Sequence, residues 1–293
     1  MKISYKTKMG ECWFGDALKI LPKKIEDSSI NLIMTSPPYA LLKKKDYGNV
    51  EQNEYIEWFR YFANEFHRIL TEDGSLVINI GSAWNKGLPT KSLYHYELLL
   101  DLCNRPDDPS KRFHLAQETF WHNPAKMPLP VQWVNVKRIR IKETVENIFW
   151  LSKTPHPKAS NKKVLTPYKK DMKKLLKTGK YNQGRRPSGS LVTDKWGKDN
   201  GGAIPSNLLD YSNTGSGSYR KKLRDNELTQ HPAMYPESLP EFFIKLCTNE
   251  NDIVLDPFSG SNTTGFVAEN LKRKWISIDS NEEYTKNSEF RFK

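Results

Sequence analysis

The stretch DIVLDPFSGSNTTGFVAENL, residues 252–271, joins a short apolar run to a loop of small residues and then to a segment with helical character. The apolar run is short and rich in β-branched residues, which is typical of a buried strand. A second apolar run, KWISID at 274–279, follows the helical segment directly. The stretch therefore predicts a strand, loop, helix and strand in succession, the unit from which parallel sheets covered by helices are built.

Apolar runs and helical patterns alternate in the same way along most of the chain. INLIMT at 30–35 reads as a fully apolar strand, and residues 54–70 carry apolar side chains at helical spacing. Ser238 stands three residues before Glu241, which is a capping-box signature for the start of another helix. We expect a doubly wound, mostly parallel α/β sheet. Further strands are predicted at 74–82, 116–122 and 145–153, and a further helix at 91–103.

The loop at 260–265, GSNTTG, matches the fingerprint G-x-G-x-x-G except that Asn262 replaces the middle glycine. Asp279 follows 19 residues after Gly260, at the end of the next predicted strand. An acid in that place can accept both hydroxyls of an adenosine ribose, so the pattern indicates an adenosine-containing cofactor. The missing glycine argues against a bound pyrophosphate. A tight strand-to-helix turn without any ligand is the alternative.

Positive charge is concentrated in residues 151–230. This block holds 18 Lys and Arg against 6 Asp and Glu, a net charge of +12 that equals the formal charge of the whole chain. It is also poor in apolar residues and rich in turn-forming stretches. We interpret it as an inserted region that binds a polyanion, and a solvated or disordered linker is the alternative.

Composition limits the remaining classes of protein. The three cysteines, Cys12, Cys103 and Cys247, lie far apart and form no C-x-x-C motif, so we expect reduced thiols, no disulfide framework and no metal site. No run of 18 apolar residues is present, and the N-terminus lacks an apolar signal region. We therefore expect a soluble, cytoplasmic protein without a membrane partner.

The segment TSPPY, residues 35–39, ends the apolar run at 30–35 with a hydroxyl, two prolines and an aromatic ring. A proline pair after a strand can be a simple stop signal. Together, however, TSPPY and DPFSGSNTT (256–264) resemble two motifs of the DNA amino-methyltransferases, one for the target amine and one for S-adenosyl-L-methionine. Their order, with the basic block between them, resembles the permuted β-class of that family. The resemblance implies the Rossmann-like fold of S-adenosylmethionine-dependent methyltransferases.

The resemblance is closer still to the PvuII-type restriction–modification methyltransferases, and it extends over almost the whole chain. A serine before the two prolines resembles the cytosine-N4 branch, whereas the adenine-N6 branch more often has Asp or Asn there. The resemblance thus implies a site-specific enzyme that forms N4-methylcytosine in double-stranded DNA, with adenine-N6 methylation as the alternative. The segments that carry this resemblance are TSPPYALLKKKDYGN (35–49), FWHNPAKMPLPVQWVN (120–135), RPSG (186–189), KDNGGAIPSNLL (198–209), HPAMYPESLPEFF (231–243) and SNTTGFVAE (261–269).

The resemblance implies roles for the residues of the proline corner. A cytosine amino group is a poor nucleophile because its lone pair is delocalised into the ring. Ser36 and the carbonyl of Pro37 would accept its two N–H bonds and direct the lone pair at the sulfonium methyl, while Pro37 and Pro38 would hold the loop rigid. Tyr39 would stack on the base after it has been flipped out of the duplex. Methyl transfer would be direct.

Residues for the cofactor and for DNA follow from the same resemblance. Asp16 either contacts the cofactor adenine or caps a helix, Phe258 lines the cofactor pocket or packs in the core, and His231 is expected to be structural. The predicted cofactor-binding residues are Asp16, Asp256, Phe258, Gly260, Ser261, Thr263 and Asp279. The predicted DNA-binding residues are Lys43, Lys44, Lys45, Arg185, Arg186, Arg220 and Arg224, and 197–205 is a candidate recognition loop.

The expected organisation has three parts: residues 1–150 carry the catalytic corner, 151–230 recognise the target, and 231–293 bind the cofactor. A cognate restriction endonuclease acting at the same DNA site is an implied partner. Two other classes of protein stay open. A nicotinamide-dependent dehydrogenase would account for Gly260 and Asp279 but leaves TSPPY unexplained, and a catalytically silent DNA-binding protein would keep the fold for recognition alone.

Overall fold

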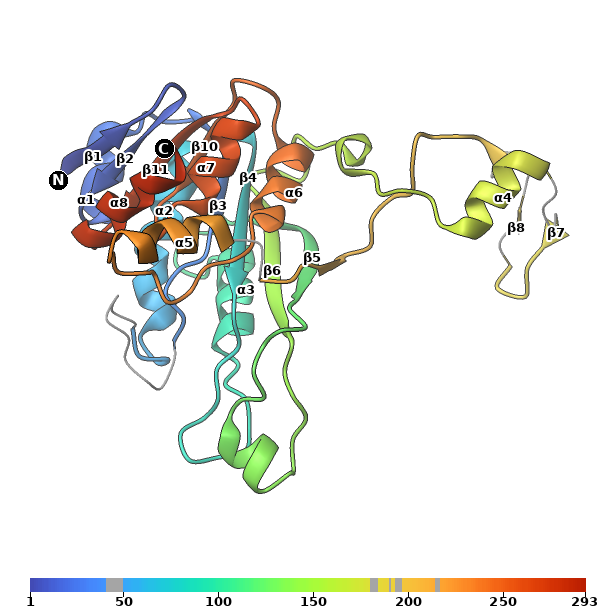
Figure 1. The fold of residues 1–293 in the computed structure, drawn as a ribbon, viewed down its shortest axis with the longest axis horizontal. Helices are drawn as coiled ribbons and strands as arrows, with labels where there is room; N and C mark the ends of the chain where they lie inside the picture. The colour runs from blue at the N-terminus through green and yellow to red at the C-terminus, as the bar shows by residue number, and fades with distance from the viewer. Residues whose placement is uncertain (41–49, 180–183, 190, 193–196, 214–216) are drawn as a thin grey trace. The chain divides into compact units, whose positions relative to one another are not determined.

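The computed structural model describes residues 1–40, 50–179, 184–189, 191–192, 197–213 and 217–293. The chain separates into two compact units, of which the larger contains residues 1–159 and 207–293 and the smaller contains residues 160–206. The larger unit is built on one sheet with helices on both faces (Figure 1).

The sheet of the larger unit has nine strands in the order β1-β2-β11-β10-β3-β4-β6-β5-β9. The five strands from β2 to β4 run parallel, which confirms the predicted mostly parallel sheet. Strand β6 runs antiparallel to both β4 and β5, so β5 points in the same direction as β4. The strands are β1 Lys2–Lys6, β2 Gly10–Phe14, β3 Ile30–Thr35, β4 Leu70–Ile80, β5 His114–His122, β6 Val145–Ser152, β9 Leu208–Asp210, β10 Ile253–Asp256 and β11 Lys274–Asp279.

Helices cover both faces of the sheet. Helix α2 packs against α1 and α3 and contributes Phe59, Phe62 and Phe66 to the main core, while α7 packs against α6, β10 and β11. The helices of this unit are α1 Ala17–Lys24, α2 Tyr55–Ile69, α3 Tyr94–Asn104, α5 Gly217–Asp225, α6 Ser238–Cys247, α7 Thr263–Asn270 and α8 Glu282–Ser288; the short helices are η1 Pro109–Lys111, η2 Gln132–Val136 (a π-helix) and η5 Glu289–Arg291. None of the described helices is long and apolar enough to span a membrane.

One local prediction was wrong. Helix α6 begins at Ser238 itself, and Glu237 occupies the cap position with helical backbone angles and no side-chain cap hydrogen bond. The chain enters this helix through Pro236, whose carbonyl accepts from the backbone N–H of Leu239, so the turn before the helix replaces the expected capping box.

The smaller unit has little core in its described part. It contains η3 Asn161–Val164, α4 Lys170–Thr178 and a two-stranded sheet of β7 Gly184–Arg185 and β8 Leu191–Val192. Among residues 160–179, 185–189 and 197–206, Leu175 is the one large apolar side chain that is buried. The basic block of residues 151–230 thus falls partly in each unit, because residues 151–159 and 207–230 belong to the larger one.

Candidate active site

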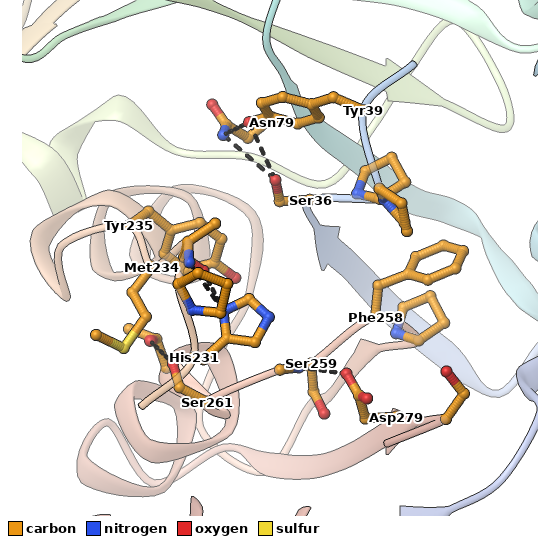
Figure 2. Close-up of a pocket in the computed structure, with 18 of the residues that line it drawn as sticks. Ser36, Tyr39, Asn79, His231, Met234, Tyr235, Phe258, Ser259, Ser261 and Asp279 are labelled. Atoms are coloured by element: carbon orange, nitrogen blue, oxygen red, sulfur yellow. Dashed lines mark hydrogen bonds between the residues drawn. The ribbon is translucent and has the colours of Figure 1, made fainter. Parts of the chain in front are cut away.

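The proline corner and the glycine-rich loop line one cavity of about 500 Å³ in the larger unit. Figure 2 shows Ser36, Tyr39 and Asn79 on one side of it, with Phe258, Ser259 and Asp279 on the other. The predicted site residues that line this cavity are Ser36, Pro37, Pro38, Tyr39, Asp16, Phe258, Gly260, Ser261, Thr263 and Asp279.

The topology of the sheet explains why the two segments meet. Strand β3 ends at Thr35 and its neighbour β10 ends at Asp256, and the two strands are parallel. The loops that follow them, beginning at Ser36 and Pro257, therefore leave from the same edge of the sheet. Ligands of open α/β sheets bind at this carboxyl edge.

Asn262, which departs from the glycine of the fingerprint, is held in a left-handed conformation with φ 52°. Asparagine tolerates this conformation better than most residues, and its side chain adds a helix cap that glycine lacks. Its Oδ1 accepts from the backbone N–H of Gly265 at 3.0 Å and from Ser277 Oγ at 2.6 Å, and its Nδ2 donates to the hydroxyl of Tyr5 at 2.7 Å. The departure from glycine therefore fixes the start of α7.

Asp256 lies beneath the cavity and is not among the residues that line it. Its carboxylate accepts from Thr35 Oγ1 at 2.7 Å, Thr264 Oγ1 at 2.8 Å, the Phe258 N–H at 3.1 Å and the hydroxyl of Tyr235 at 3.2 Å. Burial raises the pKa of Asp256 to about 6 in spite of these donors. This side chain ties the end of β3 to the glycine-rich loop.

Asp279 faces the cavity from the end of β11. Its Oδ2 accepts from the Gly260 N–H at 2.7 Å, and its Oδ1 accepts from the Asn281 N–H at 2.8 Å. Burial raises the pKa of this carboxyl, while the two N–H donors lower it. Each oxygen has one partner here and can accept further hydrogen bonds.

Asp16 both lines the cavity and caps α1, because its Oδ1 accepts from the Leu18 N–H at 3.0 Å. Asp16 therefore caps the helix, as one of the two predictions had it, and it also faces the cavity.

An aromatic wall closes the end of the cavity that Asp279 faces. The ring of Phe258 lies 4.9 Å from that of Phe62 and 5.9 Å from that of Trp58, measured between centroids. All three line the cavity. Ser259 lies beside them, and its Oγ is buried without a hydrogen-bond partner among the described residues. An apolar wall beside an unused hydroxyl and the Asp279 carboxylate suits a ligand with a flat ring and several hydroxyls.

Arg291, near the C-terminus, was missed by the sequence analysis. Its buried guanidinium donates to the Ser261 carbonyl at 2.6 Å and to Thr263 Oγ1 at 3.0 Å, and it lies 3.9 Å from the centroid of the Tyr219 ring. Ser261 and Thr263 are thus held by this arginine as well as facing the cavity. The contact joins residues 28 and 30 positions apart in sequence, and no local pattern indicates it.

At the opposite end of the cavity, four side chains form a hydrogen-bonded chain. The Ser36 hydroxyl donates to the Tyr39 hydroxyl at 3.2 Å, which in turn donates to Glu146 Oε2 at 2.8 Å. Asn79 Nδ2 donates to the Tyr39 hydroxyl at 2.8 Å and to Glu146 Oε2 at 3.2 Å. Burial, and next the charge of Glu146, raise the pKa of Tyr39 well above its ordinary value. Tyr39 therefore remains a neutral hydroxyl that both accepts and donates.

Asn79 and Glu146 were not predicted as site residues. Asn79 lies near the end of β4, is 1% exposed, and its Oδ1 has no hydrogen-bond partner among the described residues. Gly81, two residues later, packs against the Tyr39 ring so closely that an added Cβ would lie 2.5 Å from it. A polar residue near the carboxyl end of a predicted strand was the available signal for Asn79, whereas Glu146 comes near the start of β6.

His231 lines the cavity and packs against Gly260. A Cβ added to Gly260 would lie 2.9 Å from His231 Nε2, and the φ of Gly260 is +48°. Its ring contacts Tyr284 edge-on at 4.6 Å, and burial lowers its pKa. This environment favours a neutral side chain that packs against the glycine-rich loop.

The predicted DNA-binding residues are not brought together in one unit. Arg220 and Arg224 lie on α5 in the larger unit, while Arg185 and Arg186 lie in the smaller one. Lys43, Lys44 and Lys45 lie outside the described residues. Among the described side chains, no group of three or more His, Cys, Asp or Glu residues could hold a metal ion.

Comparisons with known proteins agree with this architecture. A family model described as DNA methylase matches residues 30–290. The type II methyltransferase M.PvuII of Proteus hauseri is 45% identical over 99% of this chain and 86% of its own length. DNA adenine methyltransferase YhdJ of Escherichia coli (strain K12) is 29% identical over 93% of this chain and 79% of its own.

A solved structure gives the same result for the fold. The PvuII DNA methyltransferase (cytosine-N4-specific) superposes with a TM-score of 0.80 at 39% identity, covering 100% of this chain and 89% of that one. The resemblance noted in TSPPY and DPFSGSNTT is thereby confirmed, and the chain belongs to the DNA methylase family.

Proposed function

We propose that this protein transfers a methyl group from S-adenosyl-L-methionine to the N4 amino group of cytosine in double-stranded DNA. The observation that carries the proposal is the single cavity lined by both the serine–proline corner and the glycine-rich loop. A methyl group can pass directly from donor to acceptor only when both occupy one enclosed space.

The cofactor end of the cavity fits S-adenosylmethionine. Asp279 would accept the ribose hydroxyls, the Phe258 wall would cover the adenine, and the unpartnered Ser259 hydroxyl would meet a polar group of the cofactor. Bound there, the cofactor supplies a methyl group made electrophilic by its sulfonium. We assign Asp256 to holding the loop, because its oxygens are occupied by protein donors.

The catalytic end supplies hydrogen-bond acceptors for the target amine, and its carboxylate, Glu146, is linked to Ser36 through the Tyr39 hydroxyl. Ser36 donates its own proton toward Tyr39 and accepts from Asn79 Nδ2 at 3.5 Å, which leaves one lone pair that can accept an N–H of the target amine. The Pro37 carbonyl would accept the second N–H of the amine, as the resemblance implied. Such contacts direct the nitrogen lone pair, and their main effect is orientation.

The amine must lose one proton for each methyl group that it gains. We propose that this proton passes to Ser36 Oγ as the Ser36 proton passes to Tyr39 and the Tyr39 proton passes to Glu146. The two hydrogen bonds of 3.2 and 2.8 Å already run in that direction. The proton ends on the carboxylate of Glu146, whose other oxygen accepts from Lys126 Nζ at 3.0 Å. Asn79, which cannot take up a proton, holds the two hydroxyls in line.

DNA affinity would come mainly from the basic residues of 160–206 and of α5. With such phosphate contacts, the logarithm of the binding constant falls linearly with the logarithm of the salt concentration. The slope is about −0.9 for each phosphate that is neutralised. The enzyme would act in the cytoplasm, where bacterial DNA lies, as the modification partner of an endonuclease with the same site.

Adenine-N6 methylation is the second candidate, because YhdJ, named as a DNA adenine methyltransferase, is also a relative. The higher identity to M.PvuII and the serine at position 36 favour cytosine. The test is to incubate the protein with labelled S-adenosylmethionine and unmethylated genomic DNA, digest the DNA to nucleosides and identify the labelled one. N4-methylcytosine is expected. Labelled N6-methyladenine would overturn the base assignment, and no labelled nucleoside would overturn the proposed activity.

A further inference from the structure

The connection between β5 and β6, residues 123–144, extends beyond the sheet and is here called the finger (Figure 1). Three of the most exposed large apolar side chains of the described protein lie on it: Ile141 is 89% exposed, Val136 71% and Met127 70%. Half or more of Leu129, Val131 and Ile139 is exposed as well. So many exposed apolar side chains on one projection mark an interaction surface.

Positive charge accompanies these apolar side chains. The finger contains Lys126, Lys137, Arg138, Arg140 and Lys142 but only one acid, Glu143. Lys91 of the neighbouring loop forms an ion pair with that acid. A surface of exposed apolar residues among cations is complementary to a partner that has both apolar faces and negative charges.

The finger is ordered by its own contacts. Trp133 is buried within it, its carbonyl accepts from the Ile139 N–H at 3.0 Å, and Lys137 Nζ lies 4.8 Å from the centroid of its ring. Arg140 Nε donates to the Pro89 carbonyl at 2.9 Å, which joins the finger to the loop between β4 and α3. The exposed apolar side chains are thus presented on a preformed framework.

The base of the finger is part of the cavity. Strands β3, β4 and β5 run in the same direction, so the finger leaves from the same sheet edge as the Ser36 corner. Asn123 at one end of the finger, and Glu146 just beyond the other, line the cavity. Lys126, within the finger, donates to Glu146. A molecule bound to the finger would therefore lie next to the cavity that is proposed to receive the target base.

We propose that the finger is a duplex-opening element: its basic residues contact DNA phosphates, and its apolar side chains fill the space left in the stack when the target base enters the cavity. Apolar side chains inserted between base steps are a known means of distorting duplex DNA. The proposal rests on the proposed function, since it assumes that the cavity receives a base. It adds the element that makes the duplex accessible.

The test compares methyl transfer to duplex and to single-stranded DNA of the same sequence. The variant V136S/I141S removes apolar surface from two exposed positions, and L100S is the matched control because Leu100 is 60% exposed on α3. We expect V136S/I141S to lose at least tenfold of its rate on duplex DNA while keeping its rate on single strands, where no base must leave a stack. L100S should keep both rates, and S-adenosylmethionine binding measured by calorimetry should be equal in all three proteins.

The charges are tested separately by binding to a random-sequence duplex over a range of KCl concentrations. The variant K137Q/R138Q should reduce the slope of log affinity against log salt by about 1 to 2, and K19Q on α1 should leave it unchanged. An unchanged ratio of duplex to single-strand rates together with an unchanged slope would overturn the proposal. Loss of binding to anionic vesicles, or of self-association in sedimentation, with DNA behaviour intact would assign the finger to a membrane or to a second copy and would also overturn it.

If the wild-type protein transfers no methyl group to either DNA, the proposed function fails at that step. The salt slopes still decide whether the finger contacts DNA, because they do not depend on catalysis.

Discussion

The two ends of the cavity are built on different principles. At the cofactor end, the polar side chains beneath the loop are paired with one another: Asp256, Asn262 and Arg291 each make three or more hydrogen bonds to protein groups. At the catalytic end, Ser36 keeps an unused acceptor toward the cavity, Asn79 Oδ1 is buried without a hydrogen-bond partner among the described residues, and the bonds of both side chains lead through Tyr39 to Glu146.

This difference separates stability from activity. Groups that are buried and fully paired contribute to the folded state, and removing one leaves its partners unsatisfied. Groups that face the substrate with unused acceptors contribute little to folding and much to the reaction. Substitutions of the paired residues beneath the cofactor end should therefore change the free energy of unfolding, and substitution of Ser36 at the catalytic end should change the rate.

The largest expected effect is that of S36A on the rate. Loss of the hydroxyl removes both the amine acceptor and the first step of proton removal, and such groups contribute about 10²–10⁴-fold. Single-turnover kcat should fall by that factor, while the thermal midpoint should change by no more than 2 °C, about the shift of a 0.5 kcal/mol effect. A large drop in the thermal midpoint would show that the two ends of the cavity do not differ in this way.

A pH dependence of stability is expected at the cofactor end. The pKa of Asp256 rises from 3.8 to about 6 on folding, so the folded state holds the proton more strongly than the unfolded state does. Its contribution is fully present below the unfolded pKa and is lost as pH rises through about 6, to a total of up to about 3 kcal/mol. Urea unfolding of wild type and D256N between these limits should show the difference between the two proteins shrinking as pH rises. A constant difference would mean that Asp256 is ionised in the folded protein throughout.

Asn262 provides the next test of the cofactor end. N262A loses the cap of α7, worth about 1 kcal/mol, and places alanine in the left-handed region at a cost of about 1–2 kcal/mol. N262G loses the same hydrogen bonds but adopts that conformation freely. Chemical unfolding should therefore rank the wild type above N262G and N262G above N262A, with about 1–2 kcal/mol between the two variants. Equal stability of the two variants would mean that the backbone conformation at 262 contributes nothing.

The same division describes what could be predicted from the sequence. Short apolar runs such as 30–35 and 253–256 report local burial, so the strands, their parallel arrangement and the loops that follow them could be predicted. Arg291, Asn79 and Glu146 act through contacts across the fold, and single-chain periodicity carries no signal for such contacts. Asn262 was recognised as a departure from glycine, but its cap depends on Tyr5 and Ser277 in other strands.

The net charge of residues 151–230 predicted affinity for a polyanion but did not predict how this block folds. Net charge describes affinity for polyanions, and it does not indicate where a chain folds back into its core. Tyr219 and Leu223 of α5 are buried against the C-terminal segment, and the burial of these two side chains places part of the basic block in the larger unit. Two apolar side chains at helical spacing within that block were the signal for this packing.

The test that most sharpens the comparison concerns the chain from Tyr39 to Glu146. E146Q keeps the shape of the side chain but removes the proton acceptor, and Y39F removes the hydroxyl between it and Ser36. Either change interrupts the proton path, so kcat should fall by about 10²-fold, the lower end of the contribution of a proton-transfer group. KM for DNA and S-adenosylmethionine affinity should change little.

Whether the chain acts as a unit is measured by combining the two changes. If protons pass from Ser36 through Tyr39 to Glu146, the first substitution already breaks the path, so the double variant should be no slower than the slower single variant. If the two side chains act independently of one another, the two losses should multiply. G81A, which would push on the Tyr39 ring, serves as a third probe because it displaces the hydroxyl without removing it. Its kcat should fall in the wild-type background and fall less in Y39F, where the ring is still displaced but no longer carries the hydroxyl of the proton path.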